Sequence, residues 1–271
     1  MAFLNEDVQR LDRELVVRGL SRSRSEAARA IEDGTVLVDG QTCARVAQMV
    51  NSTQKIELRG HPTWVGRAAL KLEHALVEFH LDVAGKAALD VGASTGGFTQ
   101  VLLSRGAQSV VALDVGHGQI AAEIRTDPRV RVVEGFNARN LDRSSLSELA
   151  PEFESPTICV IDVSFISLTL ILPPIASSID PQADIVALIK PQFEVGKGRL
   201  KAGVVSEPSA HAESIRRVLN SAFEVGLATM ALTSSPIIGG KGNREFLVWF
   251  NPNEGSHPTE WEQRIVELVS S

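Results

Sequence analysis

The chain has 271 residues, of which 44% are hydrophobic and 22% are charged, a composition typical of a globular protein that buries a sizeable core. This length fits a small domain joined to one of about 200 residues. The net charge of -6 excludes a protein that coats nucleic acid without specificity, so any RNA contact must come from local basic patches.

The apolar stretches of the sequence are short. Residues 185–189 and 246–250 are examples of the longest, and they fall far below the roughly 20 residues that a membrane span needs. The first residues lack the basic flank and apolar core of a secretory signal. We therefore expect a cytoplasmic protein with no membrane span.

Cysteine and histidine spacing does not predict a metal site. Cys43 and Cys159 are the only cysteines and form no C-x-x-C pair, and the six histidines are scattered. We expect two buried free thiols and no bound metal.

Residues 1–60 are expected to form a small α+β unit. Apolar residues between positions 8 and 31 recur at helical spacing, with a break at Gly19, which predicts two short helices. Residues 35–38 and 55–58 are expected to form short strands. The helical part carries Arg10, Arg13, Arg18, Arg22, Arg24 and Arg29 against only Asp12, Glu14 and Glu26. This local basic surface fits either RNA binding or an ordinary solvated pair of helices.

A linker is expected at residues 61–65, followed by a larger domain over residues 66–271. This domain opens with an amphipathic helix over 66–80, whose polar stripe includes Lys71. Strands are predicted at 87–91, 109–114, 130–133, 158–162, 184–190, 228–233 and 245–250, and helices near 97–105, 117–125, 141–149, 168–178 and 209–225. Seven strands with intervening helices predict a doubly wound, mostly parallel α/β sheet that binds ligands at the carboxyl ends of its strands.

A glycine-rich turn follows the first of these strands. Asp90 ends the strand, three glycines open the loop, and Asp114 ends the next strand. The glycine spacing differs from the G-x-G-x-x-G that binds a pyrophosphate, so a dinucleotide is disfavoured. An acid before the loop and another after the next strand instead fit S-adenosylmethionine, whose single ribose can bind a carboxylate. A purely structural turn beside an unrelated acid is the alternative.

The residues predicted to bind this cofactor are Asp90, Gly92, Ala93, Ser94, Thr95, Gly96, Gly97, Phe98, Asp114 and Asn137. Asn137, just past the third strand, could meet the adenine amine or could serve as a turn residue.

Charged residues at the ends of strands indicate which group could accept the methyl group. Asp162 and Lys190 follow apolar strands, and Glu245 begins a strand that would reach the same edge of the sheet if it ran antiparallel. Lys71 on the leading helix can lie over that edge. A ribose hydroxyl is a poor nucleophile and gains from a nearby base. A lysine desolvated beside a second ammonium is partly neutral and suits that role. Taken singly, each of these residues is more often an ordinary strand-end charge.

At these residues the chain closely resembles the TlyA family of bacterial proteins. Its members are known both as hemolysin A and as ribosomal RNA cytidine 2'-O-methyltransferases with an FtsJ-like catalytic domain. The resemblance extends over about residues 8–250. The matching segments are 10–12, 18–23, 90–99, 114–116, 162–168 (DVSFISL) and 190–198 (KPQFEVGKG), and the last two are highly specific.

The resemblance implies a Rossmann-like, seven-stranded class I methyltransferase sheet behind a small RNA-binding domain like that of a small-subunit ribosomal protein. It implies that Lys71, Asp162, Lys190 and Glu245 form a catalytic Lys-Asp-Lys-Glu tetrad with Lys190 as the base; the local match is loosest around Glu245. The implied cofactor is S-adenosylmethionine. The implied substrate is cytidine ribose in ribosomal RNA or ribosomal subunits, of the large subunit and, in one subgroup, of the small subunit as well. The tail past Asn251 favours that subgroup.

The residues predicted to contact RNA are Arg10, Arg13, Arg18, Arg22, Arg24 and Lys197. Lys197 opens a glycine-containing loop, shared with Arg199 and Lys201, that fits either phosphate contact or a solvated loop. The oligomeric state is left open between a monomer and a weak dimer.

Three other functions compete with this interpretation. A membrane-damaging toxin is disfavoured because the chain has no span, no signal and no strongly basic amphipathic helix. A ribosome-assembly factor that binds RNA without methyl transfer is the second. The third is a methyltransferase acting on protein or small molecules, which the basic N-terminal unit disfavours.

Overall fold

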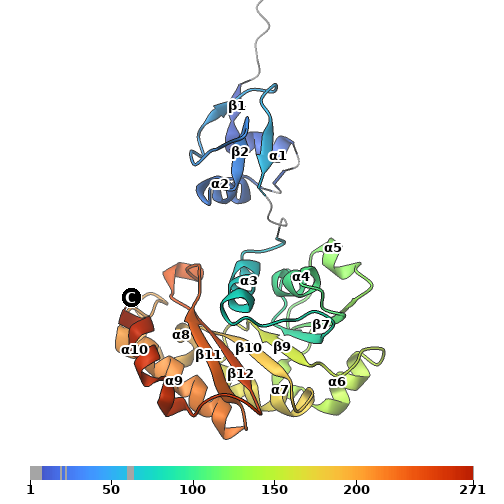
Figure 1. Cartoon of the computed structure of the whole chain (residues 1–271), viewed down its shortest axis with the longest axis vertical. Helices are drawn as coiled ribbons and strands as arrows, with labels where there is room; N and C mark the ends of the chain where they lie inside the picture. Colours follow the sequence, from blue (N-terminus) through green and yellow to red (C-terminus); the bar gives the residue numbers. More distant parts are fainter. Residues whose placement is uncertain (1–7, 19, 22, 60–63, 271) are drawn as a thin grey trace, which may run out of the picture. The chain divides into compact units, whose positions relative to one another are not determined.

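The computed structural model describes residues 8–18, 20–21, 23–59 and 64–270. The chain forms two compact units, Met1–Trp64 and Val65–Ser271 (Figure 1). We call them the N-terminal unit and the C-terminal unit.

The N-terminal unit packs two helices against short antiparallel strands. Its elements are β1 (Gln9–Arg10), α1 (Leu11–Val17), α2 (Arg24–Glu32), β2 (Val36–Val38), β3 (Gln41–Thr42), β4 (Met49–Val50) and β5 (Ile56–Leu58). Both predicted helices and both predicted strands are confirmed, whereas the two-residue strands β1, β3 and β4 were not predicted. Leu11, Leu15 and Ile31 are fully buried and form a core with Val36. These are the apolar positions that gave the helical spacing.

The C-terminal unit is built on a seven-stranded sheet in the order β11-β12-β10-β9-β6-β7-β8. The strands are β6 (Ala87–Val91), β7 (Ser109–Asp114), β8 (Val130–Glu134), β9 (Ile158–Ile161), β10 (Asp184–Ile189), β11 (Ala228–Ser234) and β12 (Phe246–Asn251). β12 runs antiparallel to both of its neighbours, β10 and β11. The other neighbouring strands of the sheet are parallel to each other. The predicted doubly wound sheet is therefore confirmed, and the last strand does begin at the edge where β9 and β10 end.

Helices cover both faces of this sheet (Figure 1). One face carries α3 (Ala68–Glu78), α4 (Gly97–Ser104) and α5 (Ala122–Arg125), and the other carries α6 (Arg143–Leu149), α7 (Leu172–Ser178), α9 (Pro208–Glu224) and α10 (Glu262–Ser270). A short helix, α8 (Pro191–Glu194), follows β10 directly. In the part of the chain that the structure describes, no helix combines the length and apolarity needed to cross a membrane.

Two predicted helices are shorter than expected. The segment predicted as a helix over 117–125 is helical only from Ala122, because Gly118 adopts a left-handed φ of 67°. The segment 168–178 begins as a 3-10 turn, Leu168–Leu170, before α7 starts with two prolines in its first turn. The tail past Asn251 contains α10, which was not predicted and packs on α9 through Ile265.

Three strand boundaries also differ from the prediction. Asp162 and Lys190 were expected to end strands and Glu245 to begin one, but the strands stop at Ile161 and Ile189 and resume at Phe246. Lys190 precedes Pro191, which has no N–H to continue the ladder. The charged side chains therefore lie one residue beyond the sheet.

Candidate active site

A cavity of about 170 Å³ opens where the carboxyl ends of the parallel strands meet. One wall is the turn between β6 and α4, residues 92–98, which we call the glycine wall. The opposite wall is made by Asp162, Ser164 and Lys190, which we call the charged wall. The start of α3 closes the cavity through Gly66, Arg67 and Ala68.

The glycine wall contains glycines at positions where a side chain would collide with neighbouring segments of the chain. Gly92 has a φ of 86°, and a Cβ placed on it would lie 2.5 Å from the carbonyl oxygen of Asp162. Gly96 has a φ of 94° and opens α4. Gly97 packs against α3, where an added Cβ would come 3.1 Å from the backbone nitrogen of Ala69. The glycines therefore let the turn pack closely on the segment after β9 and on α3, and the turn forms a cradle along one side of the cavity.

Asp114 holds the glycine wall in place from the end of β7. Its carboxylate accepts hydrogen bonds from the backbone N–H of Ser94 at 2.8 Å and of Gly116 at 2.6 Å. A carboxylate has about four acceptor positions, so Asp114 retains capacity for the hydroxyls of a ribose.

Asp90 lies behind the turn rather than on the cavity surface. It is fully buried, and one carboxylate oxygen accepts a hydrogen bond of 2.6 Å from the Thr99 hydroxyl. Burial raises the pKa of Asp90 to about 7, against the opposing effect of the Thr99 hydrogen bond. Asp90 thus anchors α4 beneath the cradle.

Asn137 is exposed and caps a short helical turn, Ala138–Asn140. Its side-chain oxygen accepts a hydrogen bond from the backbone N–H of Arg139 at 3.1 Å. Of the predicted cofactor residues, the cavity is lined by Gly92, Ala93, Ser94, Thr95, Gly97 and Phe98.

The charged wall centres on Lys190, which is 8% exposed. Its ammonium lies 2.5 Å from an Asp162 carboxylate oxygen and donates a hydrogen bond of 2.9 Å to the Ser164 hydroxyl. Strand β9 supplies Asp162 and strand β10 supplies Lys190, so neighbouring parallel strands create the pair.

A second buried ion pair joins α3 to the start of β12. Lys71 lies 2.6 Å from Glu245, and both side chains are nearly inaccessible to solvent. Gln192, two residues after Lys190, donates to the other oxygen of Glu245 at 3.4 Å. The sequence suggested a lysine beside a second ammonium; in the structure each lysine is instead paired with a carboxylate.

Two aromatic residues beside Lys190 were missed in the sequence. Phe165 is 91% exposed and has a left-handed φ of 65°, an uncommon conformation for a bulky residue. Its ring lies 5.1 Å from that of Phe193, and the Lys190 ammonium is 6.0 Å from the centre of the Phe193 ring. Both lie in the two segments most specific to the resemblance, which was the signal that could have found them.

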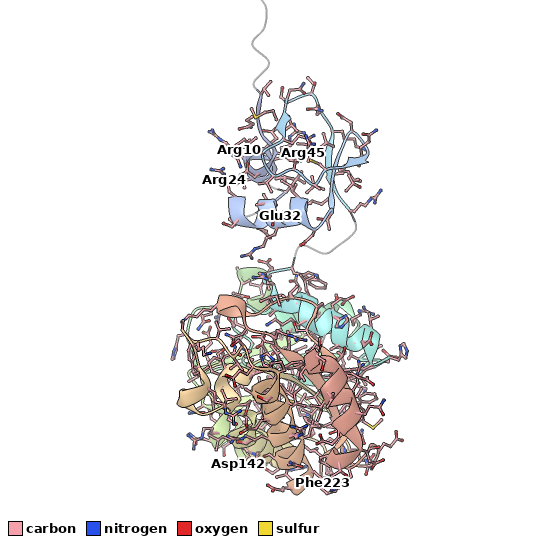
Figure 2. The ribbon with its side chains drawn as sticks, turned by 90° about the vertical axis from the view of Figure 1, so that its left-hand side faces the viewer. Arg10, Arg24, Glu32, Arg45, Asp142 and Phe223 are labelled. Carbon is pink, nitrogen blue, oxygen red and sulfur yellow. The ribbon has the colours of Figure 1, made fainter. Side chains whose placement is uncertain are left out.

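The predicted RNA-binding arginines have different surroundings. Arg10 and Arg24 lie on the same side of the N-terminal unit (Figure 2) and bind Asp12 at 3.0 and 2.8 Å. Hydrogen bonds from Arg10 lower the pKa of Asp12, with a further contribution from Arg24. Both guanidinium groups remain largely exposed.

Arg18 makes internal contacts, whereas Arg13 is exposed. Arg18 lies 2.6 Å from Glu14 and donates to the carbonyl oxygens of Gln54 and Asn51 at 2.7 and 3.1 Å. Arg22 lies outside the described residues. Lys197 begins a 3-10 turn, Lys197–Arg199, and its side chain is likewise outside what the structure describes.

Cys43 and Cys159 are buried free thiols, as predicted. Within the described residues, no group of histidine, cysteine, aspartate and glutamate side chains is arranged to hold a metal ion.

Comparison with known proteins supplies a second line of information. The FtsJ-like methyltransferase family matches residues 64–252, and the S4 domain family matches residues 9–56. A Mycobacterium tuberculosis protein named 16S/23S rRNA (cytidine-2'-O)-methyltransferase TlyA is 45% identical over 243 residues, which are 89% of this chain and 88% of that protein. Hemolysin A of Brachyspira hyodysenteriae is 39% identical over 242 residues, which are 89% of this chain and 99% of that protein. A solved structure from Streptococcus thermophilus, named as a hemolysin, aligns with a TM-score of 0.72 at 36% identity and covers 97% of this chain and 94% of that one.

Proposed function

The chain belongs to the FtsJ-like methyltransferase family, and we propose that it transfers a methyl group from S-adenosylmethionine to the 2'-oxygen of a cytidine in ribosomal RNA. The observation that carries this proposal is the buried pair of Lys190 and Asp162 facing the glycine wall across one cavity. The resemblance seen in the sequence is confirmed, and with it the dependence on S-adenosylmethionine. The S4 domain supports an RNA substrate, and the name of the Mycobacterium tuberculosis relative supports cytidine.

We propose that the glycine wall holds the cofactor. Gly92, Ala93 and Gly97 line the cavity with little or no side chain, which leaves the main chain open to a ligand, and Asp114 has acceptor positions for ribose hydroxyls beyond its two backbone contacts. Asp90 and Gly96 would then contribute by shaping and supporting this wall, and Asn137 stays the predicted contact for the adenine amine. When bound, S-adenosylmethionine supplies an electrophilic methyl group.

Lys190 is the proposed base. The 2'-hydroxyl loses its proton as its oxygen gains the methyl group, and the Lys190 amine accepts that proton. The amine must have released its own proton to solvent beforehand, and the Asp162 carboxylate, at 2.5 Å, stabilises the ammonium that forms as Lys190 takes the 2'-proton. Lys71 and Glu245 complete the proposed catalytic tetrad by fixing α3 and β12 beside the cavity.

We propose that each of the two units contacts RNA. Phe165 presents an exposed ring beside Lys190, suited to stacking on an unpaired base. In the N-terminal unit Arg10, Arg13 and Arg24 keep exposed guanidinium groups for phosphates, and Arg22 and Lys197 remain proposed contacts. We also propose the division into a domain at 1–60, a linker at 61–65 and a methyltransferase domain at 66–271. We propose a cytoplasmic location as well, which a ribosomal RNA substrate supports.

Labelled methyl transfer to ribosomal RNA and to ribosomal subunits, followed by mapping of 2'-O-methylcytidine, tests this function. Lys190→Ala is expected to lower the transfer rate about 10³-fold while the affinity for S-adenosylmethionine changes little. The matched control is Lys86→Ala, which removes another lysine paired with an aspartate, Asp184 at 2.7 Å, at the start of β6 and away from the cavity. Lys86→Ala should keep wild-type transfer. Wild-type protein that binds the cofactor and RNA but transfers no methyl group would contradict the proposal.

Two rival functions are separated by the same proteins. A ribosome-assembly factor would retain its function in the Lys190→Ala variant. A hemolysin, as the Brachyspira relative is named, would lyse cells as purified protein whether or not Lys190 is changed.

A further inference from the structure

Glu194 is a buried carboxylate that lies near the charged wall but does not line the cavity. It is the last residue of α8, four residues after Lys190, and is 3% exposed. Burial raises its pKa, against hydrogen bonds from Ser167 and Leu168 that lower it. Burying a carboxylate costs free energy unless hydrogen bonds compensate for the lost solvation. The hydrogen bonds of Glu194 therefore indicate what this residue does in the fold.

The contacts of Glu194 all cross to other segments of the chain. Its carboxylate accepts a hydrogen bond of 2.5 Å from the Ser167 hydroxyl and one of 2.9 Å from the backbone N–H of Leu168. Its carbonyl oxygen accepts a hydrogen bond of 2.9 Å from Arg217 on α9. Glu194 is therefore fixed to α9 on one side and holds the segment after β9 on the other.

That segment, residues 162–168, carries half of the charged wall. Asp162 and Ser164 both contact Lys190, and Phe165 packs on Phe193. The Lys190 contacts must change as the lysine loses and gains a proton, whereas the Glu194 contacts involve no reacting group. Glu194 can thus keep the ends of β9 and β10 in position while the contacts between Lys190 and Asp162 change. We call this set of Glu194 contacts with Ser167 and Leu168 the brace.

We propose that Glu194 is a positioning residue for methyl transfer: through Ser167 and Leu168 it holds Asp162 and Ser164 against Lys190, and Phe165 against Phe193. Glu194 touches neither the cavity nor the reacting atoms. The proposal rests on the proposed function, in which Lys190 acts on the acceptor hydroxyl.

Three variants separate the brace from simple charge or folding effects. Glu194→Ala removes both contacts. Ser167→Ala removes one without changing any charge, together with the hydrogen bond by which the Ser167 hydroxyl caps the turn at Thr169. Glu194→Gln can keep both, because its amide oxygen can accept from Leu168 and its amide nitrogen can donate to the Ser167 oxygen. Matched controls are Glu262→Gln, which neutralises an exposed partner of Arg216, and Ser177→Ala, which removes an exposed hydroxyl.

The expected order of single-turnover rates at saturating RNA is wild type, Glu194→Gln, Ser167→Ala and then Glu194→Ala. At saturating RNA, Glu194→Ala should lose about 10- to 100-fold in rate, as misplacement of a reacting group does, with affinity for S-adenosylmethionine nearly unchanged. In a Lys190→Ala background the further loss from Glu194→Ala should disappear, because the brace acts through Lys190. Glu194→Gln falling as far as Glu194→Ala, or a loss that persists without Lys190, would overturn the proposal.

A readout independent of activity separates this proposal from the proposed function. Fluorophenylalanine resonances of Phe165 and Phe193, assigned with Phe165→Leu and Phe193→Leu, should shift or broaden together in Glu194→Ala and stay in place in Glu194→Gln. If they do so while the wild type methylates no RNA, the proposed function fails and the brace stands. Unchanged resonances in folded Glu194→Ala would refute the brace whatever the enzyme methylates.

Discussion

The two walls of the cavity are built in different ways. The glycine wall is one continuous segment, residues 92–98, and its shape depends on its own backbone, in which the Ser94 N–H donates to the Asp114 carboxylate. The charged wall combines the ends of two strands and is held by side chains, chiefly the pair of Lys190 and Asp162. Local sequence can specify the first kind of wall, whereas the second exists only once the sheet has formed.

The energetic roles of the walls differ as well. Buried ion pairs contribute little net stability, yet removing one partner leaves a costly unpaired charge. In the glycine wall the free-energy cost lies in the backbone conformation, because Gly92, Ser94 and Gly96 each have a left-handed φ. The charged wall is therefore expected to be sensitive to changes of charge, and the glycine wall to any added side-chain atom.

The largest effect is expected from Gly92→Ala, because the two walls meet at this residue. The new Cβ would lie 2.5 Å from the carbonyl oxygen of Asp162, so the backbone of both walls must shift. We expect kcat/KM to fall about 10³-fold and cofactor affinity at least about tenfold, measured by labelled methyl transfer and by calorimetric titration with S-adenosylmethionine.

Gly85→Ala is the matched control for that change. Gly85 also has a left-handed φ, 71°, but an added Cβ meets no described atom within 4 Å. It should cost about 1 kcal/mol of stability and leave activity intact. Equal losses in the two variants would mean that backbone strain, not contact between the walls, is responsible.

The same contrast explains what could be predicted from the sequence. The strand-turn-helix around Gly92 and the acid at Asp114 are local patterns, and the apolar runs predicted where the seven strands lie along the chain. The alternation of strands and helices also placed Asp162 and Lys190 at one edge. The pairing of each lysine with its own carboxylate, and the contacts of Glu194, depend on distances between segments that no local pattern encodes.

Phe165→Ala tests the charged wall without changing a charge. If the exposed ring stacks on a base, its removal should lower kcat/KM for RNA by about 10- to 100-fold, the equivalent of about 1–3 kcal/mol. Cofactor affinity should stay the same. Phe165→Tyr should restore most activity, and Phe223→Ala, which removes a partly exposed ring on α9, should have no effect. A ring at position 165 that proves dispensable would rule out the stacking role.

Asp90→Asn tests the support behind the glycine wall through the pH dependence of stability. Because burial raises the pKa of Asp90 from 3.8 to about 7, the folded chain holds a proton that the unfolded chain has already lost between these values. This contribution to stability is complete below pH 3.8 and is lost as the pH rises through about 7. Relative to Asp90→Asn, the wild type should therefore lose about 2 to 3 kcal/mol between pH 5 and pH 8.

Denaturant unfolding of both proteins at the two pH values measures this difference. The amide of asparagine does not titrate, so its effect on the free energy of unfolding is the same at both pH values. The comparison therefore isolates the titration of the Asp90 carboxyl group. Parallel stability curves for the two proteins would mean that Asp90 is ionised in the fold.

The smallest effects are expected in the N-terminal unit, where Arg13 and Arg18 were predicted alike from the sequence to contact RNA. Arg18→Gln removes contacts to Glu14 and to three backbone carbonyls and should cost about 1–3 kcal/mol of stability while RNA affinity at low temperature is kept. Arg13 is exposed, with no partner among the residues described. Arg13→Gln should leave the melting temperature unchanged, weaken RNA binding severalfold and reduce the slope of log K against log salt by about 0.7 to 0.9. Because phosphate contacts and internal contacts differ in salt dependence, this pair separates an arginine that binds RNA from one that holds the domain together. An unchanged salt slope in Arg13→Gln would remove Arg13 from the RNA-binding surface.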